Sequence, residues 1–190
     1  MPGWLEQLHC YKRILKPLGF PKPLLNSFLT IPRHLFMPKA VRHFSYIDTE
    51  VRYQQQHILS PLQEMTLLTA LDIQPAQHVL EISSDIGFIT AILHNHLKYF
   101  TSIQQPQNAK KLSRILASLQ LPPLEHFKAA TPRLLQNKTY DRIIMTGAAL
   151  DAIPTLLLKA LQPAGKLVMI LEQNNIQQAI LIQSNMIGQY

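Results

Sequence analysis

The sequence predicts an α/β protein built on a doubly wound, largely parallel sheet. From about residue 61 onward, strand-like apolar runs alternate with stretches of helical spacing. Runs such as His78–Ile82 and Asp141–Thr146 are apolar almost throughout, as in strands that are buried on both faces. Hydrophobic residues make up 47% of the 190 residues and charged residues 15%, so a sizeable core is expected. This alternation is typical of a parallel sheet with helices on both faces.

The first 60 residues read as a helical and extended segment in front of the sheet. Trp4, Leu8, Tyr11 and Leu15 follow helical spacing and predict an amphipathic helix. The elements expected in order are a helix at 4–15, breaks at Pro17, Pro21 and Pro23, a short helix at Leu24–Leu29 and an irregular, partly extended stretch at 36–61. We therefore expect a segment at 1–60 and an α/β domain at 61–190, joined in one compact unit.

The α/β part is expected to begin with a helix from Pro61 to about Leu71, because proline suits the first helical position, where the N–H is unpaired anyway. The strands predicted beyond it are His78–Ile82, Tyr99–Ile103, Leu124–Lys128, Asp141–Thr146, Lys166–Leu171 and 176–183. The predicted helices are Gly87–Leu97, Gln107–Leu119 and Ile153–Leu161, with a short helical or loop element at Thr131–Leu135.

Composition restricts the class of protein. No run of about 18 apolar residues occurs, so no membrane span is expected. Cys10 is the single cysteine, which excludes an internal disulfide and favours a cytoplasmic protein.

The net charge is +7, of which residues 1–52 carry +5, but no stacking aromatics alternate with the basic residues, so nucleic-acid binding is not expected. His94 and His96 lie two apart on a predicted helix and do not face each other, so no metal site is predicted. The oligomeric state is left open.

Three motifs follow one another along the chain. They are IPRHLFMPKAVRHFSYID at 31–48, VLEISSDIGFITA at 79–91 and YDRIIMTGAALDAIPTLLLKALQPAGKLV at 140–168. In these motifs and their order the chain resembles the protein-L-isoaspartate O-methyltransferase family, whose members carry V-P-R-x-x-F-V-P, a glycine turn and Y-D-x-I-I-V-T-A-A-A-x-D-x-I-P. The first and third motifs together carry the resemblance, because the middle one would fit any methyltransferase of this fold.

The resemblance implies a Rossmann-like sheet of the seven-strand methyltransferase type. It also implies a protein-repair reaction, in which S-adenosylmethionine methylates isoaspartyl carboxylates of a protein or peptide. Carried over by position, the cofactor residues are Glu81, Ser83, Asp85, Gly87, Gln104 and Thr131, and the catalytic candidate is Ser60. Because the chain stops at Tyr190, the final strand of the family is expected to be missing or truncated.

Several of these positions depart from the family. The turn E-I-G-T-G-S-G-Y has become E-I-S-S-D-I-G-F, so only Gly87 remains of its glycines. Asp85 would bring a carboxylate close to the carboxylate of the cofactor, unless it caps the following helix instead. Gln104 replaces a glutamate that accepts the ribose hydroxyls, and Thr131 stands near the place of the acid that reaches the adenine amino group. Leu59 occupies the place of the family's serine, with Ser60 beside it.

Two hypotheses therefore stay open. In the first, the chain is an isoaspartyl methyltransferase with a variant pocket for S-adenosylmethionine. In the second, it is a catalytically silent relative without a cofactor that binds a protein or peptide. Three altered contacts at about 1–2 kcal/mol each would weaken cofactor binding about a hundred- to ten-thousand-fold if they add. Methyl transfer depends mainly on positioning, so such losses would affect the essential step.

Overall fold

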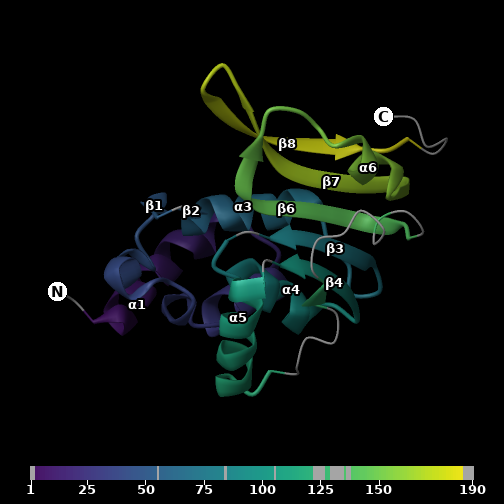
Figure 1. The fold of residues 1–190 in the computed structure, drawn as a ribbon. Helices are drawn as coiled ribbons and strands as arrows, with labels where there is room; N and C mark the ends of the chain where they lie inside the picture. The colour runs from purple at the N-terminus through teal and green to yellow at the C-terminus, as the bar shows by residue number, and fades with distance from the viewer. Residues whose placement is uncertain are drawn as a thin grey trace.

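The computed structural model describes residues 3–54, 56–83, 85–104, 106–121, 127–128, 135 and 138–185. Its centre is a six-stranded sheet with the order β5-β4-β3-β6-β7-β8 (Figure 1). The strands are β3 (His78–Ser83), β4 (Tyr99–Gln104), β5 (Phe127–Lys128), β6 (Tyr140–Leu150), β7 (Leu161–Gln173) and β8 (Ile176–Gln183). The pairs from β5 to β7 are parallel, and β8 is antiparallel to β7. The predicted α/β fold is confirmed, although the described residues contain six strands in this sheet and not seven.

Helices cover both faces of the sheet. One face packs on α3 (Pro61–Leu71), α4 (Phe88–His96) and α5 (Pro106–Ser118), and the other on α6 (Thr155–Lys159). Neighbouring strand residues alternate between the two sides, as the pleat requires. Ile144 and Val168 belong to the first core cluster, whereas Ile143 and Leu167 belong to the second. This layering leaves the carboxyl ends of the parallel strands at one edge of the sheet, where α/β proteins bind their ligands.

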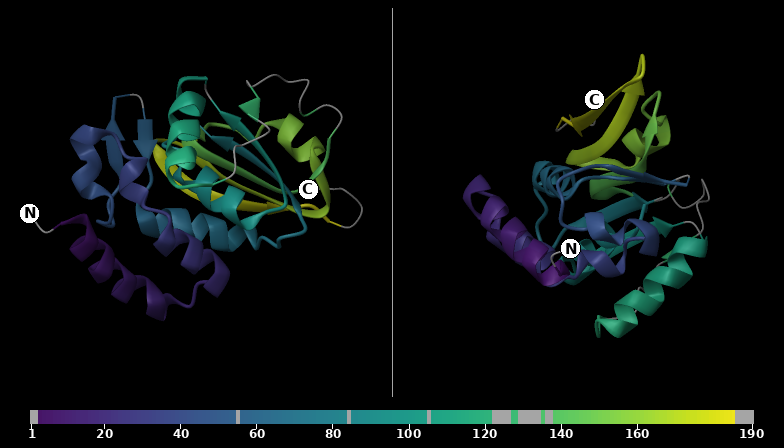
Figure 2. Two further views of the ribbon diagram at one scale, coloured as in Figure 1. Left: turned by 90° about the horizontal axis from the view of Figure 1, so that it is seen from below. Right: turned by 90° about the vertical axis from the view of Figure 1, so that its left-hand side faces the viewer.

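The N-terminal segment packs against the helices of the first face. It comprises α1 (Trp4–Leu15), η1 (Lys16–Leu18), α2 (Lys22–Thr30), η2 (Arg33–Leu35), η3 (Lys39–Phe44), β1 (Val51–Tyr53) and β2 (Gln56–Ile58). Both views in Figure 2 place α1 on the outside of the molecule. Phe28 and Phe36 meet the ring of Phe88 edge to face, with centroids 5.1 and 5.6 Å apart. One buried cluster therefore contains side chains from this segment and from the α/β part.

A buried ion pair ties the first motif to α3. Arg33 Nε lies 2.8 Å from Glu64 Oε2, and both side chains are 1% exposed. Nη1 and Nη2 of Arg33 donate to the carbonyls of Ser45 and Leu59, at 2.9 and 2.7 Å, and Nη2 also donates to Glu64 Oε1 at 3.2 Å. Because all of these partners are internal, Arg33 fixes the loop that leads into α3 and does not face a ligand.

The structure corrects several expected boundaries. The helix predicted at Ile153–Leu161 is only the five-residue α6, and the strand predicted at Lys166–Leu171 is the longer β7. The stretch at 36–61 contains the 3-10 helix η3 and the antiparallel β1–β2 pair, which the periodicity does not reveal. Residues 131–134 of the predicted element at 131–135 and residues 124–126 of the predicted strand at 124–128 lie outside the described residues. No helix in the described ranges is long and apolar enough to cross a membrane.

Candidate functional site

The turn after β3 has one position where glycine is required. Gly87 has a φ of +81°, in the left-handed region that residues with a Cβ rarely adopt. A Cβ on it would also lie 3.0 Å from Cδ2 of Leu112 on α5. The glycine that the chain retains is therefore the one that the strand–turn–helix geometry needs.

Asp85 fills the turn and binds within it. Its Oδ1 accepts hydrogen bonds from Ser83 Oγ and from the backbone N–H of Gly87, both at 2.8 Å. Its own carbonyl accepts from Asn108 Nδ2 at 3.2 Å, and the residue is 3% exposed. The expectation that Asp85 caps the following helix is wrong, because Gly87 is the N-cap residue and no side chain caps α4. Asp85 instead joins the end of β3 to the start of α4.

Glu81 lies at the centre of a buried hydrogen-bond network. Thr90 Oγ1 donates to its Oε1 at 3.0 Å, and Ser102 Oγ donates to its Oε2 at 2.8 Å. Both hydroxyls in turn accept from Gln104 Nε2, at 2.8 and 2.9 Å. Burial, and next the nearby carboxylate of Asp85, raise the pKa of Glu81 to about 8, although the hydroxyl donors oppose the rise. Every polar atom of the Glu81 carboxyl group is thus bound inside the protein.

Gln104 turns its amide nitrogen into this network and leaves its oxygen unpaired. Oε1 of Gln104 is buried and has no hydrogen-bond partner among the residues that the structure describes. An unpaired buried acceptor is uncommon in a folded protein and needs an explanation. A ribose hydroxyl could donate a hydrogen bond to this amide oxygen of Gln104.

The residues of this edge fit an S-adenosyl nucleoside at β4 but not at the turn. Gln104 supplies one free acceptor, whereas Ser83 and Asp85 place side chains in the turn where close backbone approach needs glycine. Glu81, Ser83, Asp85 and Gln104 are all at least 95% buried, and Ser83 and Asp85 bind each other within the turn. Thr131, the remaining cofactor candidate, lies outside the described residues. Taken together, the described residues offer the cofactor an acceptor at Gln104 and occupy the turn with the side chains of Ser83 and Asp85.

Ser60, the catalytic candidate, is the N-cap of α3. Its Oγ accepts from the backbone N–H of Gln63 at 3.2 Å, and Gln63 Oε1 accepts from the N–H of Ser60 at 2.8 Å. This reciprocal arrangement is a capping box, and it explains the serine without any chemistry. Leu59, at the place of the family's serine, is buried.

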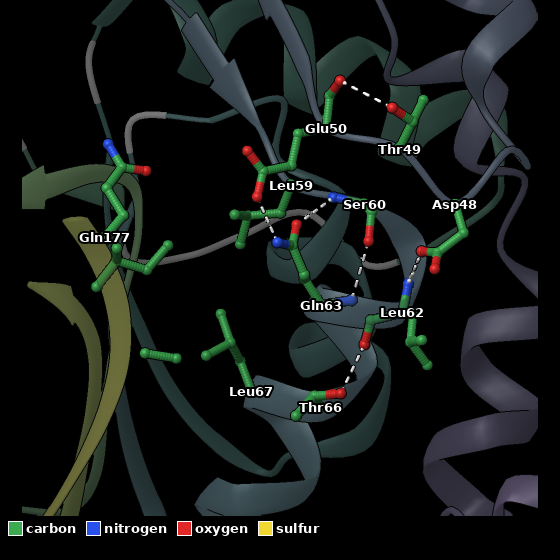
Figure 3. A pocket seen from close by; sticks show the side chains of 12 residues that line it. Asp48, Thr49, Glu50, Leu59, Ser60, Leu62, Gln63, Thr66, Leu67 and Gln177 are labelled. Carbon is green, nitrogen blue, oxygen red and sulfur yellow. Dashed lines mark hydrogen bonds between the residues drawn. The ribbon is translucent and has the colours of Figure 1, made fainter. Parts of the chain in front are cut away.

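A cavity of about 650 Å³ opens beside this helix start, and we refer to it as the α3–β8 cavity (Figure 3). The segment 48–50 and the loop before α3 form one wall, and the ends of β7 and β8 form the other. In Figure 3, Leu67 of α3 lies on the side of Gln177 of β8, whereas Leu62 lies beside Asp48 at the other side. Ser60 lines this cavity, but Glu81, Asp85 and Gln104 do not. The structure therefore places the catalytic candidate and the cofactor candidates in two different environments.

The sequence predictions missed Thr90, Ser102 and Asn108, which hold the buried acid and the turn. Ser102 could have been found, because it lies two residues before Gln104 and so on the same face of β4, and it pairs in register with Glu81. Thr90 lies nine residues beyond Glu81 on another element, so only tertiary structure brings them together. No group of three metal-ligating side chains is found among the residues that are described.

The chain is similar to one family throughout. The model of the family described as Protein-L-isoaspartate(D-aspartate) O-methyltransferase (PCMT) matches residues 14–189. Protein-L-isoaspartate O-methyltransferase 2 of Archaeoglobus fulgidus is 26% identical over 93% of this chain and 83% of its own length. The protein-L-isoaspartate O-methyltransferase of Dictyoglomus turgidum is 31% identical over 83% of this chain and 76% of its own.

Solved structures agree on the fold. A protein-L-isoaspartate O-methyltransferase chain superposes with a TM-score of 0.75 at 18% identity, covering 94% of this chain and 60% of the other. The chain thus spans 60% of that solved protein. A putative enzyme of the same name from Plasmodium falciparum, solved in complex with S-adenosyl-L-homocysteine, gives a TM-score of 0.69 at 19% identity, covering 91% of this chain and 88% of its own. On its fold, its motifs and a family match over nearly its whole length, this chain belongs to the protein-L-isoaspartate(D-aspartate) O-methyltransferase family.

Proposed function

We propose that this chain is a catalytically silent member of its family, which keeps the methyltransferase fold and binds a protein or peptide at the carboxyl edge of the sheet. The observation that carries this proposal is the closed turn. Asp85 accepts hydrogen bonds from Ser83 and from the N–H of Gly87, so the groups that should face a cofactor bind one another.

The energetic argument rests on the buried carboxylate. A ligand that enters this turn must separate a buried acid from two donors, each worth about 1.5–3 kcal/mol for a charged group. The incoming nucleoside carries a carboxylate of its own, which cannot replace those donors for Asp85. Since 1.4 kcal/mol is a factor of ten in affinity, we expect dissociation constants for S-adenosyl-L-homocysteine in the millimolar range.

The acceptor side supports the same conclusion. Ser60 is occupied in the capping box of α3, and Leu59 has no group that could contact a methyl-accepting carboxylate. A silent relative needs neither contact. It needs only a surface that recognises its partner, and the α3–β8 cavity offers one.

A second candidate function is the family's own activity: methyl transfer from S-adenosylmethionine to isoaspartyl carboxylates in protein repair. The family membership and the free Oε1 of Gln104, a buried acceptor at the end of β4, favour it. The structure of the Plasmodium falciparum relative with S-adenosyl-L-homocysteine also favours this cofactor.

We propose the cytoplasm as the compartment for either function, because the chain carries only Cys10 and no disulfide can form within it.

The two candidates are separated by calorimetric titration with S-adenosyl-L-homocysteine. We would compare the wild type, Asp85→Gly and Glu6→Gln, an exposed acid outside the site. If the chain is catalytically silent, the wild type and the control should show no binding at about 10 μM ligand, a concentration that corresponds to about 7 kcal/mol of binding free energy. Asp85→Gly should bind S-adenosyl-L-homocysteine at least about ten-fold more tightly than the wild type. Micromolar binding by the wild type, together with methylation of an isoaspartyl peptide, would establish methyltransferase activity and contradict the proposal.

A further inference from the structure

The α3–β8 cavity combines an apolar floor with an acidic rim. Leu62 and Leu67 of α3, Ile170 of β7 and Ala179 of β8 are among the residues that line it. Its volume of about 650 Å³ is in the range of about 300–1,000 Å³ that is usual for ligand sites. A floor of this kind accommodates an aliphatic chain.

The charges of the rim have one sign. Within the described part of the chain, Asp48 and Glu50 are the ionisable residues that line the cavity, and no lysine, arginine or histidine there lines it. Asp48 is held in place because its Oδ1 accepts from the N–H of Leu62 at 3.1 Å. Glu50 accepts from the side chain of Gln63 and lies 2.8 Å from His57 Nε2. These hydrogen bonds, first that of Gln63, lower the pKa of Glu50, so its carboxylate is ionised at neutral pH.

Such a rim discriminates between ligands by charge. An isoaspartyl substrate brings a carboxylate and would meet two like charges, whereas a cation would be attracted by both. An aliphatic stem with a positive head is the side chain of lysine or arginine, which buries its methylene groups on apolar surface and keeps its charge in water. Both parts of such a side chain find a counterpart here.

We infer that the α3–β8 cavity binds a lysine or arginine side chain of a partner protein or peptide. This inference deepens the proposed function, on which it rests, because it names the chemistry of the partner. The methylene stem lies on the apolar part of the lining, which includes Leu67 and Ile170, and the cationic head lies at the rim that carries Asp48 and Glu50. An acidic peptide is excluded by the same rim.

The test uses three fluorescent peptides that differ in one central residue: lysine, norleucine and isoaspartate. Binding to the full chain is followed by fluorescence anisotropy at low ionic strength, where rim charges are least screened. We expect the lysine peptide to bind at least about ten-fold more tightly than the norleucine peptide, and that preference to fall as salt is added. Equal binding of lysine and norleucine peptides, tighter binding of the isoaspartyl peptide, or no binding of the lysine peptide at about 1 mM would overturn the inference.

Two variants assign the binding to this cavity. The double change Asp48→Asn with Glu50→Gln keeps the oxygen acceptors and removes both charges, so the lysine preference should disappear while the fold stays intact. Ala179→Trp, on an exposed position of β8, fills the cavity and should abolish binding of both peptides. Glu6→Gln is the matched control and should bind like the wild type. The titration with S-adenosyl-L-homocysteine is a separate measurement, so a failure of the peptide test leaves the outcome for the cofactor visible.

Discussion

Replacing Glu81 by glutamine should make the protein more stable above pH 7 and change it little at pH 5. Glu81 is fully buried, and its pKa is raised to about 8, first by burial and next by the carboxylate of Asp85. The folded state therefore holds a proton there that the unfolded chain, with its ordinary pKa of 4.5, has already lost. Between these two values, stability falls as pH rises, because the folded state binds more protons. Glutamine resembles the protonated acid and does not ionise.

The size of the effect follows from the interval between the two pKa values. Each pH unit within it costs the wild type about 1.4 kcal/mol, so the step from pH 5 to pH 8 costs about 4 kcal/mol at this one residue. At pH 5, Glu81→Gln should match the wild type to within about 1 kcal/mol, the value of one adjusted hydrogen bond. At pH 8 the variant should be more stable by several kcal/mol.

Urea unfolding followed by far-ultraviolet circular dichroism at pH 5, 6, 7 and 8 measures this difference. Glu6→Gln removes an exposed acid and is the control, with the pH profile of the wild type. The quantity to compare is the free energy of unfolding of Glu81→Gln minus that of the wild type. A difference that stays constant from pH 5 to pH 8 would refute the reasoning, because Glu81 would then be ionised in the folded state throughout.

Three further substitutions test the packing around the two sites. Ser60→Ala should lower the free energy of unfolding by about 1 kcal/mol because the capping box is lost, whereas Ser60→Thr should keep most of that stabilisation. An unchanged melting temperature of Ser60→Ala would contradict this. Arg33→Met leaves the Glu64 carboxylate buried without its cation and should cost about 3–5 kcal/mol in urea unfolding, most of which Glu64→Met should restore in the double variant. Gly87→Ala should cost at least about 1–2 kcal/mol for its positive φ alone, and adding Leu112→Ala should relieve only the steric part; full recovery in that pair would show that the backbone is not strained.

Much of the fold could be predicted from local pattern. The helix at Trp4–Leu15 and the one beginning at Pro61 have the predicted bounds, because apolar spacing and a proline at the first position are local signals. The β1–β2 pair and η3 were missed, since strands of three residues and 3-10 turns carry too few residues for a period. The antiparallel direction of β8 could not be predicted from its apolar run. It follows from the tight turn at Asn174 and Asn175, both with positive φ.

Some features of the candidate site could likewise be predicted from the sequence, and others could not. Ser83, Asp85 and Gly87 could be placed in one turn because they are neighbours in sequence. The direction in which Asp85 binds could not, because a carboxylate in a turn can cap a helix, meet a ligand or bind the turn itself, and only the positions of Ser83 and the Gly87 N–H decide among them. The α3–β8 cavity was also beyond sequence reasoning, since Asp48 and Ala179 are 131 residues apart in the chain.

We expect the two departures from the family at Asp85 and Gln104 to be energetically coupled. The amide nitrogen of Gln104 donates to Thr90 and Ser102, which pass hydrogen bonds on to Glu81, and a glutamate at this position has no N–H to donate. It would also add a third carboxylate to a buried region that already holds Glu81 and Asp85. We therefore expect Gln104→Glu to cost at least about 2 kcal/mol in the wild type, from two lost hydrogen bonds of about 1 kcal/mol each.

The same substitution should be tolerated better once Asp85 is absent. In an Asp85→Gly background one of the like charges is gone, so the cost of Gln104→Glu should fall by about 1 kcal/mol or more in a double-mutant cycle measured by urea unfolding at pH 7. Additive costs would mean that the two positions changed independently. A clear coupling would mean that the amide at β4 is a structural requirement of the closed turn, and that reopening the turn for a nucleoside requires both positions to change together.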